Sequence, residues 1–109
     1  MRPIYKTKRW KQKRASILRR DEYMCQESKR YGMSVSATTV HHIYPIEFYP
    51  ELAFVDWNLI SLCEKQHNAM HIRDGHEMTE LGKQWQERVK HKFEQWQRGR
   101  NEAIPPMLL

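Results

Sequence analysis

Hydrophobic residues recur at helical spacing near both ends of the chain. A first helix is expected to begin at Thr7, whose hydroxyl suits an N-cap. The residues of its packing face are Trp10, Arg14, Ile17 and Leu18. A last helix is predicted over residues 78–98. Its apolar stripe, interpreted as a core face, consists of Leu81, Trp85, Val89, Phe93 and Trp96.

The central part of the chain has a different pattern. Residues 35–43 are rich in β-branched side chains, and residues 58–63 form a short apolar run, so each segment is predicted to be a strand. The two prolines in residues 44–56 favour a structured loop between the strands. Residues 64–73 are expected to form a helix that stops near Gly75, whereas residues 24–32 are interpreted as a turn. The fold class predicted is therefore α+β and mainly helical.

The length of 109 residues fits one domain over residues 1–109. Within it we expect a loose basic arm at 1–6, a core at 7–73, the C-terminal helix at 78–98 and a tail at 99–109. Only 39% of the residues are hydrophobic, so the core is modest and a bound metal would add stability.

Positive charge is concentrated at the start of the chain. The net charge is +6, and the first twenty residues contain nine Lys or Arg and no acid. Such a cluster favours nucleic acid as the partner, although it could also be a solvated arm that only aids solubility. The candidates for phosphate contacts are Arg14, Arg19, Arg20 and Lys29. With no apolar leader and no long apolar run, a cytoplasmic protein without a membrane partner is expected.

Four of the six histidines form two pairs. His41 and His42 are adjacent on the first predicted strand, so their side chains should point to opposite sides. His67 and His71 are four residues apart on the predicted helix and should share one face. Three histidines and an open position would make a reactive metal site, while the fourth imidazole could take a proton from water. Either pair alone could instead be ordinary surface residues.

Three stretches around these histidines resemble the HNH endonuclease motif. They read Thr39-Val-His-His-Ile-Tyr-Pro, Asp56-Trp-Asn-Leu-Ile-Ser-Leu-Cys and His67-Asn-Ala-Met-His. The helix at residues 10–20 and the segment at residues 21–25 are similar to phage-type members, so the resemblance covers roughly residues 5–73. Residue types, order and spacing agree at several separate points, which makes the resemblance specific.

The resemblance implies a ββα-metal (His-Me finger) core around one divalent ion, which could be Mg²⁺, Mn²⁺, Ni²⁺ or Zn²⁺. It implies that His42 is the general base, that His41 and His67 are metal ligands and that His71 is a further ligand. Asn58 is expected to hold the loop that orients His42.

The implied activity is hydrolysis of DNA phosphodiester bonds, by nicking or double-strand cleavage, that leaves a 5′-phosphate and a 3′-hydroxyl. The family also suggests a role beside a phage DNA-packaging (terminase) complex, in a bacterial or phage-infected cell. The alternatives are a catalytically inactive DNA-binding module on the same fold and a purely structural metal-binding domain.

Two cysteine positions depart from the family pattern. Phage-type relatives often carry two C-x-x-C pairs that bind a structural zinc, whereas this chain has Cys25 with Ser28 and Cys63 with Gln66. Ser and Gln are poor zinc ligands, so a structural zinc is not expected. The two thiols could be free and buried, could form a disulfide because the family fold brings them close, or could retain weak metal binding.

Overall fold

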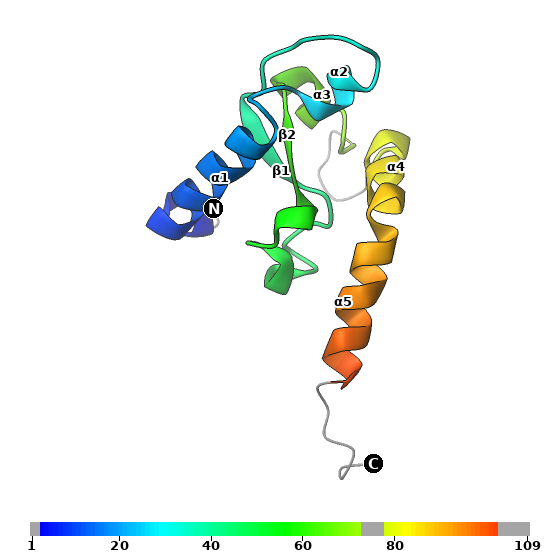
Figure 1. Ribbon diagram of the computed structural model, residues 1–109. Coiled ribbons are helices and arrows are strands. Elements are labelled where there is room, and N and C mark those ends of the chain that lie inside the picture. The colour runs from blue at the N-terminus through cyan, green and yellow to red at the C-terminus, as the bar shows by residue number, and fades with distance from the viewer. Residues whose placement is uncertain (1–2, 73–77, 103–109) are drawn as a thin grey trace.

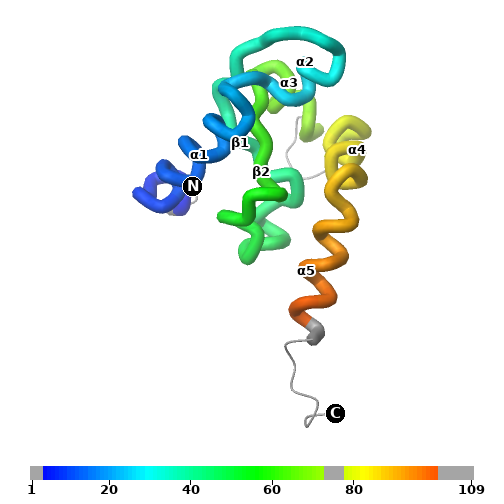
Figure 2. Tube along the Cα trace, viewed as in Figure 1, coloured from blue at the N-terminus to red at the C-terminus, as the bar shows by residue number. Residues whose placement is uncertain are grey.

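The computed structural model describes residues 3–72 and 78–102 and has the α+β architecture that the sequence predicts (Figure 1). A two-stranded antiparallel sheet forms its centre. The helices around it are η1 (Pro3–Lys6, a 3-10 helix), α1 (Lys8–Arg20), α2 (Gln26–Lys29), η2 (Pro50–Leu52), η3 (Asp56–Asn58), α3 (Glu64–Asn68), α4 (Glu80–Arg88) and α5 (Lys90–Glu102). In Figures 1 and 2, α1 lies on one side of the strands and α4 and α5 lie on the other.

The sheet consists of β1 (Thr39–His42) and β2 (Leu59–Leu62). His41 lies opposite Ile60 and His42 lies opposite Leu59. Every residue of β2 is buried, because helices and loops cover both faces of the sheet. Helix α3 follows β2 directly, so the order β1, β2, α3 is the ββα arrangement that the resemblance implies.

Helix α1 packs the first half of the chain onto the sheet. The hydroxyl of Thr7 accepts a hydrogen bond from the backbone N–H of Trp10 at 3.1 Å, which confirms Thr7 as the N-cap. The buried side chains that join α1 to the strands are Trp10, Ile17, Leu18, Val40 and Leu59. The packing face that the spacing predicts is therefore correct for its apolar members.

The C-terminal helix is divided, where the sequence predicted one helix over residues 78–98. Val89 leaves the helical conformation (φ −106°, ψ 10°) between α4 and α5, and its N–H bonds to the carbonyl of Gln86. Helix α5 also continues to Glu102, beyond the expected start of the tail. The ring of Phe93 on α5 stacks on Tyr44 with centroids 4.1 Å apart, so the apolar stripe packs on the core as predicted.

Several other boundaries differ from the prediction. The first strand is shorter than residues 35–43, because residues 35–37 bond instead to the segment at 23–25: Cys25 N–H to Val35 O at 2.7 Å and Ala37 N–H to Tyr23 O at 2.8 Å. The second strand is one residue shorter at each end than predicted. The expected turn at residues 24–32 contains α2, and the arm expected to be loose contains η1.

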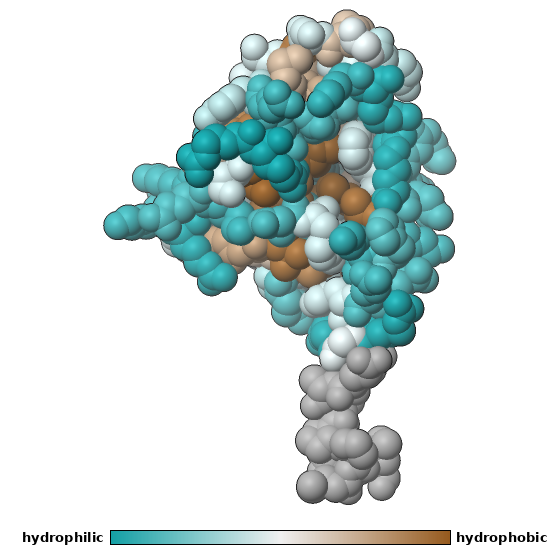
Figure 3. Space-filling model, in the orientation of Figure 1, coloured by the Kyte–Doolittle hydropathy of each residue, from teal (hydrophilic) through white to brown (hydrophobic). Residues whose placement is uncertain are grey.

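Hydrophilic residues cover most of the face seen in Figure 3, and hydrophobic residues show through between the N-terminal and C-terminal helices. No helix within residues 3–72 and 78–102 combines the length and the apolar character needed to cross a membrane.

Candidate functional site

Three histidines from separate segments converge on one point of the structure. His41 lies on β1, His67 on α3, and His71 shortly after α3. The ring centroid of His41 lies 5.3 Å from that of His67 and 5.4 Å from that of His71. The two histidine pairs are thus brought together in space, as the sequence predicts.

His71 reaches this point by a different route from the one predicted. The helix was expected to continue to residue 73, but α3 ends at Asn68, and His71 forms an isolated β-bridge with Met78. The helix ends early because Thr79 bonds to the chain just after it: its hydroxyl donates to the carbonyl of Ala69 at 2.6 Å, and its N–H donates to that of Met70 at 3.0 Å. Residue 73 and Gly75 lie outside the described residues.

The protein environment favours the neutral form of two of these imidazoles, His41 and His67. Burial lowers the pKa of His41 well below its usual value, and charge on His67, on His71 and on His42 lowers it further. Burial also lowers the pKa of His67, with a smaller contribution from charge on His71. Because only the neutral ring has a lone pair for a metal, both shifts keep the rings competent to bind a cation at neutral pH.

The donor chemistry fits a divalent ion. Within residues 3–72 and 78–102, His41 Nε2 and His71 Nδ1 are buried and find no hydrogen-bond partner, a costly state for a polar atom unless something else satisfies it. Two imidazoles on one tetrahedral ion would have ring centroids about 5 Å apart, since each nitrogen lies about 2 Å from the ion. Within the described ranges, no group of three or more His, Cys, Asp or Glu stands ready to hold a metal. The three imidazoles are near one another but are not arranged as a complete set of metal ligands.

His42 is held on the other side of β1. Its Nε2 lies 3.0 Å from the carbonyl oxygen of Ala53, and its ring stacks on Trp10 with centroids 5.0 Å apart and planes at 25°. The neighbouring histidines on β1 thus have different surroundings, as the alternation along a strand predicts. Both nevertheless line one cavity of about 190 Å³.

Asn58 fixes the loop that carries Ala53. Its side chain is fully buried, and its Oδ1 accepts a hydrogen bond from the N–H of Tyr44 at 2.7 Å. Its Nδ2 donates to the carbonyls of Tyr44 at 3.1 Å and Leu52 at 3.3 Å. The amide therefore ties the residues that follow β1 to the residue preceding Ala53.

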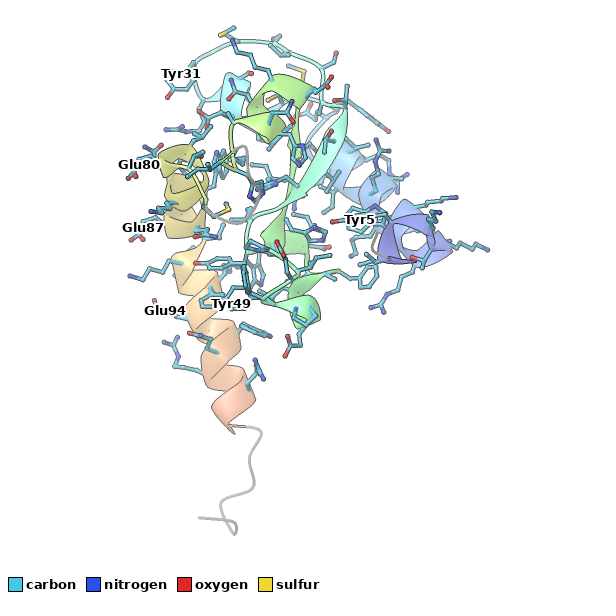
Figure 4. The ribbon with its side chains drawn as sticks, turned by 180° about the vertical axis from the view of Figure 1, so that it is seen from behind. Tyr5, Tyr31, Tyr49, Glu80, Glu87 and Glu94 are labelled. Atoms are coloured by element: carbon cyan, nitrogen blue, oxygen red, sulfur yellow. The ribbon has the colours of Figure 1, made fainter. Side chains whose placement is uncertain are left out.

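The cavity also includes residues that the sequence did not indicate. Besides the four histidines it is lined by Tyr5, Val40, Pro45, Ile46 and Glu47. Tyr5 belongs to η1, and Figure 4 shows it between the N-terminal helices and the strands. No spacing rule connects Tyr5 or Glu47 with the histidine pairs, so only the fold brings them to the site.

The four basic residues expected to bind phosphate differ in their surroundings. Arg14 donates to the carbonyl of Thr38 at 2.9 Å and lines a second cavity beside the first. Arg20 pairs with Asp21 at 2.8 Å and donates to the carbonyls of Asp56 and Leu59, so its guanidinium also joins α1 to β2. Arg19 and Lys29 are exposed on α1 and α2. Their contacts with DNA stay predictions.

The fold brings Cys25 and Cys63 into one cluster, and both thiols are free. The hydroxyl of Ser28 donates to Cys25 Sγ at 3.4 Å. Burial raises the pKa of the Cys25 thiol, but hydrogen bonds from Ser28 and Cys63 outweigh this effect, so that the pKa is lower than usual. Gln66 is half-buried on α3. Cys25 is buried and Cys63 is half-buried, and no disulfide joins the two.

The comparisons with known proteins find a similarity at the level of the fold. The chain is similar to a solved structure described as the HNH endonuclease of the deep-sea thermophilic bacteriophage GVE2, crystallised with manganese ion. The match has 31% sequence identity and a TM-score of 0.57, and it covers 59% of this chain and 70% of the other. No protein-family model and no curated protein sequence matches the chain.

Proposed function

Because this match shows that the chain belongs to the HNH endonuclease family, we propose that it is a metal-dependent endonuclease that hydrolyses phosphodiester bonds of DNA. The observation that carries the proposal is the position of His42, which lines the same cavity as the cluster of His41, His67 and His71. A base for water and a set of cation ligands are the two components that hydrolysis of a phosphodiester requires.

His42 is the general base in this proposal. A carbonyl oxygen can only accept a hydrogen bond, so the Nε2 that faces Ala53 carries the hydrogen in the neutral ring. Nδ1 is then the basic nitrogen, and it takes a proton from water. The oxygen of that water bonds to phosphorus while the bond from phosphorus to the 3′-oxygen breaks. The products are a 5′-phosphate and a 3′-hydroxyl, whose hydrogen comes from solvent.

His41, His67 and His71 are the ligands in this proposal. A divalent ion, when bound to them, would neutralise charge on the scissile phosphate and on the departing oxygen. The low pKa values of His41 and His67 keep these two rings uncharged at neutral pH, which also avoids repulsion of an incoming cation. Manganese is the first ion to test, since the related phage enzyme was crystallised with it.

Asn58 is a positioning residue in this proposal. Its amide fixes Leu52 and Tyr44, and Ala53, the residue after Leu52, orients the ring of His42. The stacked indole of Trp10 restricts the same ring from its face. A base held on two sides loses less rotational freedom in the reaction, which favours the attack geometry.

DNA is the substrate proposed because the charge of the chain complements it. Its net charge is +6, and Arg14 lies in a cavity that shares Tyr5, Val40 and His67 with the histidine cavity. A phosphate near Arg14 would therefore adjoin a phosphate at the histidines, which is the arrangement that one nucleic-acid strand offers.

The test is cleavage of supercoiled plasmid with Mg²⁺, Mn²⁺, Ni²⁺ or Zn²⁺, with and without chelator. We expect metal-dependent nicking or linearisation that His42→Ala reduces by about 10²–10⁴-fold, the usual contribution of a positioned general base. His91→Ala is the matched control, since His91 is exposed on α5.

Metal affinity, measured by calorimetry, should stay near the wild-type value in His42→Ala and fall in His67→Ala. Normal cleavage by His42→Ala would show that another group is the base. DNA binding without cleavage in any metal would instead identify the chain as an inactive binding module.

A further inference from the structure

Tyr5 stands at the junction of two cavities. The histidine cavity, of about 190 Å³, and the cavity that contains Arg14, of about 270 Å³, are both lined by Tyr5, Val40 and His67. The two hollows therefore adjoin along β1, with the histidines in one and Arg14 in the other. Of the three shared side chains, Tyr5 is the one contributed by the N-terminal segment.

The ring of Tyr5 is held in place but remains accessible. It packs edge-on against Trp10, with centroids 5.4 Å apart and planes at 84°, and its centroid lies 6.1 Å from that of His42. The backbone beneath it is fixed, because Thr7 donates to the carbonyl of Ile4 from both its N–H (3.1 Å) and its hydroxyl (2.7 Å). Even so, 43% of Tyr5 is exposed.

A DNA strand with one phosphate at the histidines and the next beside Arg14 would carry the connecting nucleoside past this ring. We propose that Tyr5 is a substrate-contacting residue whose ring packs against the nucleoside between these two phosphates. An aromatic ring suits this position, because it packs on a sugar or a base without selecting a sequence. The inference rests on the proposed function and adds a contact that sets how much of the strand the site engages.

The test compares substrates of different length. An oligonucleotide spans both cavities, whereas methyl 4-nitrophenyl phosphate is a single phosphodiester that reaches only the histidines. Tyr5→Ala should reduce kcat/KM for the oligonucleotide by about tenfold, the usual size of one lost aromatic stacking contact. It should change kcat/KM for the small diester by less than about twofold. Tyr5→Leu, which retains apolar packing on Trp10, should behave like Tyr5→Ala.

Rescue by a second aromatic ring separates this role from a purely structural one. Tyr5→Phe keeps the ring and should stay within about twofold of wild type on both substrates. Tyr31→Ala is the matched control, because Tyr31 is also exposed, at 69%, but lines neither cavity and lies away from Tyr5, near the top of the view in Figure 4.

The inference would be overturned if Tyr5→Ala and Tyr5→Leu lost kcat/KM equally on both substrates, or lost none on either. It would also be overturned if Tyr5→Phe did not retain kcat/KM for the oligonucleotide. Oligonucleotide affinity measured in chelator provides the same comparison without cleavage. An inactive wild-type protein would thus contradict the proposed function, whereas unchanged affinity in Tyr5→Ala would contradict the role of Tyr5.

Discussion

At the scale of single residues, the side chain of Asn58 connects the sheet to the loop that orients His42. It has no exposed surface, and its hydrogen bonds go to Tyr44 and Leu52. A buried amide with these partners both stabilises the fold and determines the course of the loop. An apolar residue of similar size could fill the space but would leave the N–H of Tyr44 without its acceptor.

We therefore predict that Asn58→Ala lowers the free energy of unfolding by about 2–4 kcal/mol, because it leaves buried backbone groups unsatisfied and creates a small cavity. Urea unfolding in chelator measures this change without a contribution from metal. Asn68→Ala, at an exposed asparagine on α3, is the control and should change stability by less than about 0.5 kcal/mol. Similar values for the two variants would contradict the role given to Asn58.

The sequence indicated some site residues better than others, for physical reasons. His41, His42, Asn58, His67 and His71 lie in short motifs that the sequence displays directly. Alternation along a strand predicted the directions of His41 and His42, whereas the helical spacing expected for His71 was wrong because α3 ends at Asn68. Tyr5, Glu47 and Ala53 come to the site from other segments, and Ala53 contributes only a backbone carbonyl. Every residue has a backbone carbonyl, so the residue type at position 53 does not indicate this contact. The contact of Ala53 with His42 could therefore be found only from the fold.

At the scale of elements, the site depends on how closely α4 approaches the turn after α3. A Cβ added to Gly82 on α4 would lie 2.6 Å from the carbonyl oxygen of Met70 and 2.5 Å from the side chain of Met78. Met70 directly precedes His71, and Met78 is the partner of His71 in the β-bridge. A side chain at Gly82 would thus push apart the two segments that hold His71.

We predict that Gly82→Ala lowers the free energy of unfolding by about 1–3 kcal/mol through overpacking, although alanine favours helices. It should also weaken metal binding, because His71 moves with the turn. Gly99→Ala is the matched control: Gly99 lies in α5, and no atom of the described residues lies within 4 Å of its Cβ position, so this change should be neutral or slightly stabilising. Thermal melting and metal titration of both variants test the prediction. Equal melting temperatures and equal metal affinities in Gly82→Ala and Gly99→Ala would contradict it.

The sequence predicted the identity and order of the main elements but not all of their ends. Apolar spacing located α1 and the helical C-terminal region correctly, because a buried face constrains every turn of a helix, but it did not indicate the division at Val89. The end of α3 depends on Thr79, and the start of β1 depends on bonds between residues 23–25 and 35–37. These are contacts between separate segments of the chain, so local patterns contain no signal for them.

At the scale of the whole molecule, two helical parts enclose a sheet that has two strands in the described part of the chain. Arg30 and Trp85 both bond to the buried carboxylate of Glu27, at 3.0 and 2.8 Å, and this contact joins α4 to α2. The histidine cluster similarly brings together β1, α3 and the turn after it. In a chain of 109 residues, with a correspondingly small core, a ligand held across several elements should stabilise the entire fold.

We predict that a divalent ion at 100 times its Kd adds about 2.7 kcal/mol to the free energy of unfolding, and that His67→Ala removes this increment while His91→Ala does not.

Protons compete with the ion for imidazole, so this increment in the free energy of unfolding must decrease as the pH falls. The pKa values of His41 and His67 lie below the usual value of about 6.5, so most of the increment should remain at pH 6.5 and disappear only in more acidic solution. Urea unfolding at pH 7.5, 6.5 and 5.5, with and without metal, measures the dependence. An increment already lost at pH 6.5, or one unaffected by His67→Ala, would show that the ion binds elsewhere.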